Sequence, residues 1–104
     1  MKGYLFVANT KEVIRVSVPD ELDEYYALLN CDYIEVIYRY INGKLTKLII
    51  DEEGKLKQNQ IISGMAFDGE ESIVGNILIE SEDEDIPKII EKYGMVVYNI
   101  WNAT

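Results

Sequence analysis

The sequence has no histidine among its 104 residues. This absence excludes hydrolases that use a histidine base, zinc sites with imidazole ligands and the usual proton shuttle near neutral pH. Cysteine is nearly absent as well, because Cys31 is the only one. No disulfide can form within the chain, so we expect a reducing compartment. Cys31 lacks a catalytic base and follows a predicted helix end, which favours a structural role.

Long apolar runs are also missing from the sequence. No run approaches the about 20 residues that a membrane-spanning helix needs. The apolar run from Tyr4 to Ala8 is too short for the apolar region of a signal peptide. We therefore expect a soluble, cytoplasmic protein that does not enter a membrane. A length of 104 residues, 48% of them apolar, predicts one domain over residues 1–104.

Basic residues are scarce, since ten Lys and Arg face nineteen Asp and Glu and leave a net charge of −9. A chain of this charge is not expected to bind nucleic acid directly, because the phosphate backbone attracts clustered Lys and Arg. A protein partner with a basic surface remains open. The commoner use of such a charge is solubility.

The first third of the chain changes from a strand pattern to a helix pattern. Residues 2–8 and 12–18 are rich in β-branched and aromatic residues and predict a hairpin that turns at 9–11. Residues 19–30 switch to a helical period. Asn30 is expected to close this helix in a left-handed conformation.

A second hairpin is predicted within residues 32–51. Asn42-Gly43 separates two apolar runs there, which is the strongest short-range hairpin signal. A two-residue loop fixes the register and therefore which side chains share a face, and we expect one face to point to the core. The residues on that face are Ile34, Val36, Tyr38, Tyr40, Leu45 and Ile49.

The second half of the chain is less regular. Residues 52–72 predict a turn, a loop and a short apolar piece, whereas residues 73–80 predict one continuous strand. Helical spacing predicts a helix over about 85–93, and Gly94 is a natural stop. The residues from 95 onward fit either a continuation of this helix to 102 or a strand.

Together these elements predict an α+β fold. We expect a mainly antiparallel sheet of four to six short strands, with one helix at about 20–30 on one face and a C-terminal helix. The eight tyrosines fit this fold, because their rings can pack in the core or at its rim. A binding hot spot is the alternative use, since tyrosine is enriched at interfaces.

Residues 68–85 contain eight acidic residues and no basic one. One interpretation is a solvated loop that leads into a helix, since Ser81 and Glu84 match a capping box. The other is an acidic surface that binds a basic protein or imitates the phosphates of nucleic acid. Basic residues are concentrated in 39–57, and this separation of charge favours a recognition surface. The candidate partner-binding residues are Asp68, Glu70, Glu71, Glu80, Glu82, Asp83, Glu84 and Asp85.

A second acidic run, at 51–53, is a poor metal site. Its acids are consecutive, so in an extended segment they point to opposite faces and not to one cation. We expect no metal, no cofactor and no catalytic residue in this protein. A carboxylate-dependent enzyme or a small-ligand-binding protein stays open, because acidic pairs that form only in the fold leave no trace in spacing.

Three segments occur in an informative order: YIEVIYRY at 33–40, IIDEEGKLKQNQ at 49–60 and SIVGNILIE at 72–80. In this order they resemble domain of unknown function 3846, a family of small proteins associated with phages and mobile elements. The resemblance covers about residues 31–80, and it implies no activity. The sequence departs from the family pattern where Asp32 stands for the usual Gly and Gln60 for the frequent Arg. The family-like positions are Tyr33, Glu35, Asp51, Gly54, Asn59 and Gly75.

These features predict a non-enzymatic protein-binding accessory module of a phage or mobile element. The alternative is an acidic inhibitor, of the anti-CRISPR or anti-restriction type, that imitates nucleic acid against a host defence system. A further alternative is a small-ligand-binding protein or a carboxylate-dependent enzyme. In the first two cases the expected partner is a host or phage protein with a basic surface.

Overall fold

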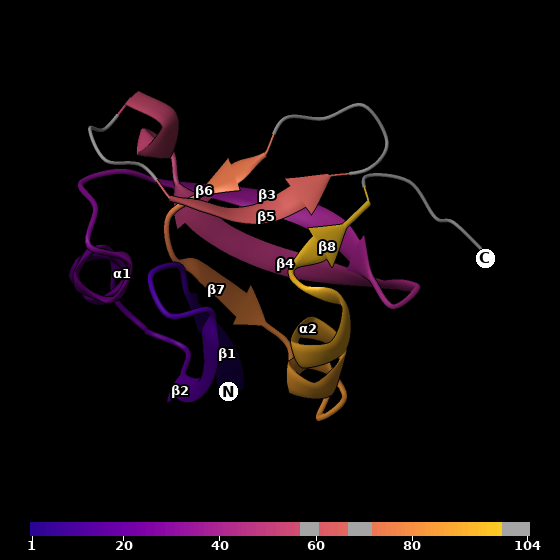
Figure 1. Cartoon of the computed structure of the whole chain (residues 1–104). Coiled ribbons are helices and arrows are strands. Elements are labelled where there is room, and N and C mark those ends of the chain that lie inside the picture. The colour runs from indigo at the N-terminus through magenta and orange to yellow at the C-terminus, as the bar shows by residue number, and fades with distance from the viewer. Residues whose placement is uncertain (57–60, 67–71, 99–104) are drawn as a thin grey trace.

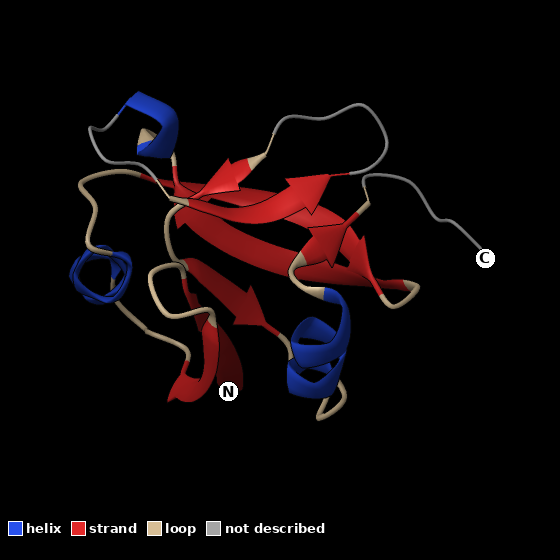
Figure 2. Cartoon of the chain, viewed as in Figure 1, coloured by secondary structure: helices blue, strands red, loops and turns tan. Residues whose placement is uncertain are grey.

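Two hairpins and one late strand form the main sheet of the protein. The structure is a computed structural model that describes residues 1–56, 61–66 and 72–98 (Figure 1). Its elements, in chain order, are β1 (Lys2–Val7), β2 (Glu12–Ser17), α1 (Leu22–Leu29), β3 (Ile34–Ile41), β4 (Lys44–Asp51), the short 3-10 helix η1 (Gly54–Leu56), β5 (Ile62–Ala66), β6 (Ile73–Val74), β7 (Ile77–Glu80), α2 (Ile86–Tyr93) and β8 (Val96–Val97). Strands predominate over helices (Figure 2). The expected α+β class is confirmed.

The main sheet has five strands in the order β2-β1-β7-β4-β3, and each neighbouring pair is antiparallel. A small sheet, in the order β6-β5-β8, contains one antiparallel and one parallel pair. Because β7 pairs with both β1 and β4, it joins the two hairpins. Its residues Ile77, Leu78 and Ile79 are completely buried, since both faces of the sheet are covered there.

Both predicted hairpins are confirmed. In the second, Asn42 and Gly43 have φ angles of 52° and 75°, the left-handed values that a tight two-residue turn requires. The pairing that follows is the predicted one, with Tyr38 opposite Lys47. Turn chemistry therefore fixes which side chains of this hairpin share a face.

The first helix is shorter than its sequence pattern indicates. α1 begins at Leu22 and not at residue 19, and Glu21 before it makes no side-chain capping hydrogen bond. The Asp20 N–H is held instead by a carboxylate oxygen of Glu24 at 3.3 Å. The predicted end is confirmed, because Asn30 adopts the left-handed values φ 52° and ψ 54°.

Apolar side chains fill both faces of the main sheet, and the two α-helices lie on opposite sides of it (Figure 1). We call the side covered by α2 and the small sheet the core face, and the other side the α1 face. The larger cluster, on the core face, includes Tyr4, Phe6, Ile41, Leu48, Ile77, Ile79, Ile86, Ile90 and Val97. The smaller cluster, on the α1 face, contains Leu5, Leu29, Cys31, Ile49 and Leu78.

The predicted core side of the second hairpin is wrong for three of its six residues. That side lies on the α1 face, where Ile49 is 2% exposed but Val36, Tyr38 and Leu45 are 44%, 53% and 58% exposed. The larger core lies behind the other side of the hairpin, where Leu48 is fully buried. Both sides of β3 and β4 are apolar, so their pattern cannot reveal which one later elements cover.

The predicted continuous strand over 73–80 is also wrong, because the chain breaks it into β6 and β7. Gly75 has a φ of +86°, a left-handed value that side-chain-bearing residues rarely adopt. Asn76 follows, and its side-chain oxygen accepts the N–H of Ala8 at 2.9 Å. The two halves consequently enter different sheets.

The end of the chain follows the strand alternative as far as it is described. α2 ends at Gly94, whose φ of +79° stops the helix as predicted. β8 then pairs with β5, and Tyr98 pairs with Tyr40 at the outer side of β3. The residues beyond 98, up to the expected helical limit at 102, lie outside the described part of the chain.

The acidic approach to α2 does not form the predicted capping box. Ser81 Oγ accepts the N–H of Asp83 at 3.2 Å, ahead of the helix, and Asp85 precedes α2 without a side-chain capping bond. Pro87 lies in the first turn, where a missing N–H costs nothing. None of the helices in the described ranges is long and apolar enough to span a membrane.

Candidate functional site

The acidic segment is partly neutralised by the chain itself. Asp83 Oδ2 lies 2.9 Å from Lys44 Nζ, and Glu80 Oε2 lies 3.0 Å from Lys47 Nζ. Glu82 accepts the backbone N–H of Lys2 at 3.1 Å. Of the other candidate partner-binding residues, Glu84 and Asp85 are exposed. Asp68, Glu70 and Glu71 lie outside the described residues.

Glu80 is not a surface acid. Its side chain is 9% exposed, on the α1 face, and its contact with Lys47 has the distance of an ion pair but not the angles of a hydrogen bond. The Tyr25 hydroxyl lies close enough to this carboxylate for an electrostatic interaction. Burial raises the pKa of Tyr25, and the negative charge of Glu80 raises it further. Glu80 therefore belongs to the interior under α1.

Asp83 is held by one ion pair and one backbone contact. The hydrogen bond from Lys44 lowers the pKa of Asp83, and the N–H of Asp85 lowers it further. The hydrogen bond with Asp83 in turn raises the pKa of Lys44. Two of the five described acids thus have a basic partner within the chain, so this surface is less negative than its sequence indicates. Among the described residues, no three acidic or cysteine side chains converge as a metal site would require.

Three family-like positions support the backbone. Asp51 Oδ1 accepts the N–H of Glu53 at 2.9 Å and so stabilises the turn after β4. A Cβ on Gly54 would lie 2.9 Å from the Val74 carbonyl oxygen, so only glycine lets η1 pack this closely on β6. Gly75 supplies the left-handed break described above. Folding accounts for all three positions.

The other family-like positions have no such explanation. The Tyr33 carbonyl accepts the N–H of Glu52 at 3.0 Å, but its side chain is 57% exposed. The Glu35 side chain is exposed on the core face and makes no hydrogen bond or ion pair with any described residue. Asn59 lies outside the described residues. Tyr33 and Glu35 are therefore better candidates for a function than for a structural role.

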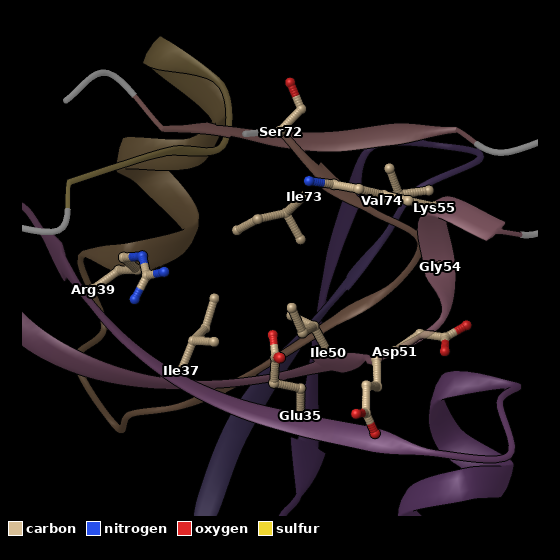
Figure 3. A pocket seen from close by; sticks show the side chains of 11 residues that line it. Glu35, Ile37, Arg39, Ile50, Asp51, Gly54, Lys55, Ser72, Ile73 and Val74 are labelled. Atoms are coloured by element: carbon tan, nitrogen blue, oxygen red, sulfur yellow. The ribbon is translucent and has the colours of Figure 1, made fainter. Parts of the chain in front are cut away.

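Glu35 lines a cleft of about 370 Å³ between the core face and the small sheet. Isoleucines form much of its wall, with Ile37 and Ile50 from the main sheet and Ile73 from β6. Figure 3 shows the side chains of Glu35 and Arg39 entering this space from β3 on either side of Ile37. Asp51 and Gly54 also line the cleft, so several family-like positions gather around it.

The opposite side of β3 carries exposed apolar side chains. Val36, Tyr38 and Leu45 lie on the α1 face beyond the reach of α1, and Tyr40 pairs with Leu45 across the hairpin. We call Val36, Tyr38 and Leu45 the apolar strip. Large exposed apolar residues that gather in this way are typical of an interaction surface.

Between the cleft and the apolar strip runs an outer edge of the main sheet. Tyr40 N–H and C=O bond to Tyr98 at 2.7 and 3.2 Å, so these groups point away from β4. Alternation turns the backbone groups of Val36 and Tyr38 the same way. In the described chain these outward groups have one partner, Arg39 Nη1, which donates to the Tyr38 carbonyl at 2.8 Å. We call the stretch from Val36 to Tyr38 the open edge.

A family model described as Domain of unknown function (DUF3846) matches residues 1–95. The chain belongs to this family. The match extends beyond residues 31–80, where the resemblance was recognised, and includes the first hairpin and α2. The family description gives no activity, and the match does not address an association with phages or mobile elements. No match to the chain was found among curated proteins or among solved structures.

Proposed function

We propose that this protein is a non-enzymatic module that binds a partner protein at the open edge of β3. The observation that carries the proposal is the position of this edge, which has a cleft on one side and the apolar strip on the other. Folding does not require Tyr38 or Leu45 at the surface, whereas binding gains from exposed aromatic and apolar side chains. In the phage or mobile-element setting that the resemblance implies, the partner is a cytoplasmic protein with a basic surface.

Two alternatives have less support. An acidic mimic of nucleic acid needs unpaired charge, but Lys44 and Lys47 neutralise Asp83 and Glu80. A small ligand is the second candidate, because a cleft of about 370 Å³ is within the range of ligand pockets. The cleft by itself, however, gives no reason for the exposed strip on the other side of the same strand.

The test compares three versions of the protein as bait in the lysate of its natural host. The strip variant combines Tyr38→Ser and Leu45→Ser, and the control Tyr93→Ser removes a tyrosine that is 63% exposed on α2. Each partner retained by the wild type is then purified, and its affinity for the three proteins is measured by calorimetry. We expect the strip variant to lose about tenfold or more in affinity and the control to lose none.

Equal affinity of the strip variant and the wild type would refute a site at β3. A small ligand would show itself differently. A metabolite fraction would then raise the Tm of the wild type and of the strip variant alike, and Glu35→Gln in the cleft would abolish the shift.

A further inference from the structure

We propose that the partner inserts an extended segment as a sixth strand along β3 and places a Lys or Arg side chain against Glu35. This inference rests on the proposed function and specifies its binding mode. The edge is suited to this mode because Tyr40, at one end of it, already exchanges two backbone hydrogen bonds with Tyr98. Among the described residues, the outward N–H and C=O of Val36 and the N–H of Tyr38 have no partner, and they provide the main-chain bonds by which an added strand binds.

Charge does not distinguish the two outer strands of the main sheet, because β2 carries Glu12 and Arg15 and β3 carries Glu35 and Arg39. Exposed apolar residues do distinguish them. Ile14 is the exposed large apolar residue of β2, whereas β3 presents Val36 and Tyr38 beside its outward backbone groups, with Leu45 of β4 next to them. Such an edge invites aggregation unless a partner covers it.

Alternation along an added strand assigns its side chains to the two faces. Residues opposite Val36 and Tyr38 lie on the α1 face, against the apolar strip, and are expected to be apolar. Residues opposite Glu35 and Ile37 lie on the core face, over the cleft. The residue opposite Ile37 meets the isoleucine wall of the cleft and is also expected to be apolar.

Charge determines the residue opposite Glu35. The carboxylates of Glu35 and Glu52 both line the cleft, and neither has an ion pair with a described residue. Asp51 and the bases Arg39 and Lys55 also line the cleft, so its lining has three acids, two bases and a net charge of −1. The cleft is therefore weakly negative, in a chain whose net charge is −9. Lys or Arg is the side chain that complements it.

The test uses display of random peptides about seven residues long, close to the usual length of a strand. Peptides selected on the wild-type protein are expected to share one basic residue among apolar neighbours. Glu35→Lys should weaken their binding about tenfold or more. Replacement of the basic residue of the peptide by Glu should restore binding to this variant and weaken binding to the wild type.

Methylated peptides test the strand itself without altering the protein. In an added strand, alternate N–H groups point to β3, so N-methylation of those residues should abolish binding, whereas methylation of the intervening residues should not. A matched pair of variants of the protein tests the same backbone hydrogen bonds. Val36→Pro removes an outward N–H and keeps the bonds to β4, and Val36→Ala removes only the side chain.

The outcomes separate the two proposals. If the strip variant loses binding, and N-methylation weakens the peptide equally at residues that point to β3 and at those that point away, the module binds a protein. The proposal of an added strand is then wrong. If Glu35→Lys leaves the affinity unchanged, the basic residue is wrong. If the protein alone forms dimers in ultracentrifugation and Val36→Pro dissolves them, a second copy occupies the edge and the partner segment is wrong.

Discussion

Two halves of the α1 face carry similar side chains, but one half is buried and the other is exposed. Under α1, Leu5, Ile49 and Leu78 are buried, whereas Val36 and its neighbours in the apolar strip stay exposed. The difference is the length of α1, which has eight residues and so extends about 12 Å. A helix of this length cannot cover five strands. Alternating apolar residues thus show which side chains share a face, but not that the face is buried.

The contrast also identifies which apolar residues folding does not explain. The covered half contributes to stability through burial, at about 25 cal/mol for each Å² removed from water. The strip contributes little in this way, because roughly half of each side chain remains in water. Its exposure is the reason that we propose it as a binding surface. Four variants probe this division, from the largest expected effect to the smallest.

Leu78→Ala should have the largest effect. Leu78 is completely buried at the centre of the main sheet, and removal of its side chain leaves a cavity. We expect the free energy of unfolding to fall by about 2–5 kcal/mol in urea titrations. The matched variant Leu45→Ala, in the strip, should cost less than about 1 kcal/mol. Equal losses in the two variants would remove the distinction between the two halves.

Asn76→Ala should have a smaller effect, at the start of the strand that lies under α1. The N–H of Ala8 loses its acceptor in this variant, and Ala8 is 4% exposed. An unsatisfied buried N–H costs about 1–3 kcal/mol, which urea titration can measure. Asn76→Asp keeps an acceptor oxygen and should lose less. A loss as large as that of the alanine variant would show that the hydrogen bond is not the cause.

Tyr38→Ser should change the free energy of unfolding by no more than about 0.5 kcal/mol, because its side chain is 53% exposed. The same change should weaken partner or peptide binding about tenfold. Parallel measurements of unfolding and binding on one preparation compare the two effects. A large loss of stability would mean that the strip belongs to the core after all.

Asp83→Asn should have the smallest effect, and it should depend on pH. The pKa of Asp83 is lowered in the folded protein, so its charge stabilises the fold above the ordinary pKa of about 4 and ceases to do so as pH falls further. The variant keeps an acceptor for the Asp85 N–H and removes only the charge. Its urea midpoint should lie slightly below that of the wild type at pH 7. The gap between the two midpoints should shrink as the pH falls below about 4 and close below the lowered pKa of the folded protein.

A gap between these midpoints that does not shrink as the pH falls below about 4 would show that charge is not responsible. High salt offers a second check, because it screens the pair with Lys44, whose side chain is 66% exposed. The Asp83→Asn change itself should not alter binding at β3, where the pair with Lys44 takes no part.

Local chemistry predicts much of this fold. The left-handed angles of Asn30 and Asn42 and the helix stop at Gly94 follow from single residues and their neighbours. The sequence does not predict the break at Gly75, because a lone glycine within an apolar run fits a continuous strand equally well. Local signals act over a few residues, and here they fix turns, register and helix ends.

The candidate site depends on longer distances. Glu35 and Gly54 were noticed as family-like positions, but the cleft that brings them together needs β6 to pack across the main sheet. Arg39 and Ile37 were not recognised as cleft residues. A usable signal is present, because Val36 and Ile37 are adjacent and both apolar, so that each face of β3 carries apolar side chains. An edge strand with that property is unusual, but its place at the edge is visible only in the fold.

The central place of β7 has a consequence for how the protein is made. Tyr4 pairs with Ile79, and the central strand of the main sheet is the last of its five strands to leave the ribosome. Until β7 emerges, β1 and β4 lack their pairing partner. Each hairpin is then isolated, and an isolated hairpin is only marginally stable in water. Closure of so long a loop slows folding relative to a helical protein of the same length. During synthesis, the nascent chain therefore exposes more unpaired strand edges than the folded protein. It is most prone to aggregate in the interval before β7 emerges.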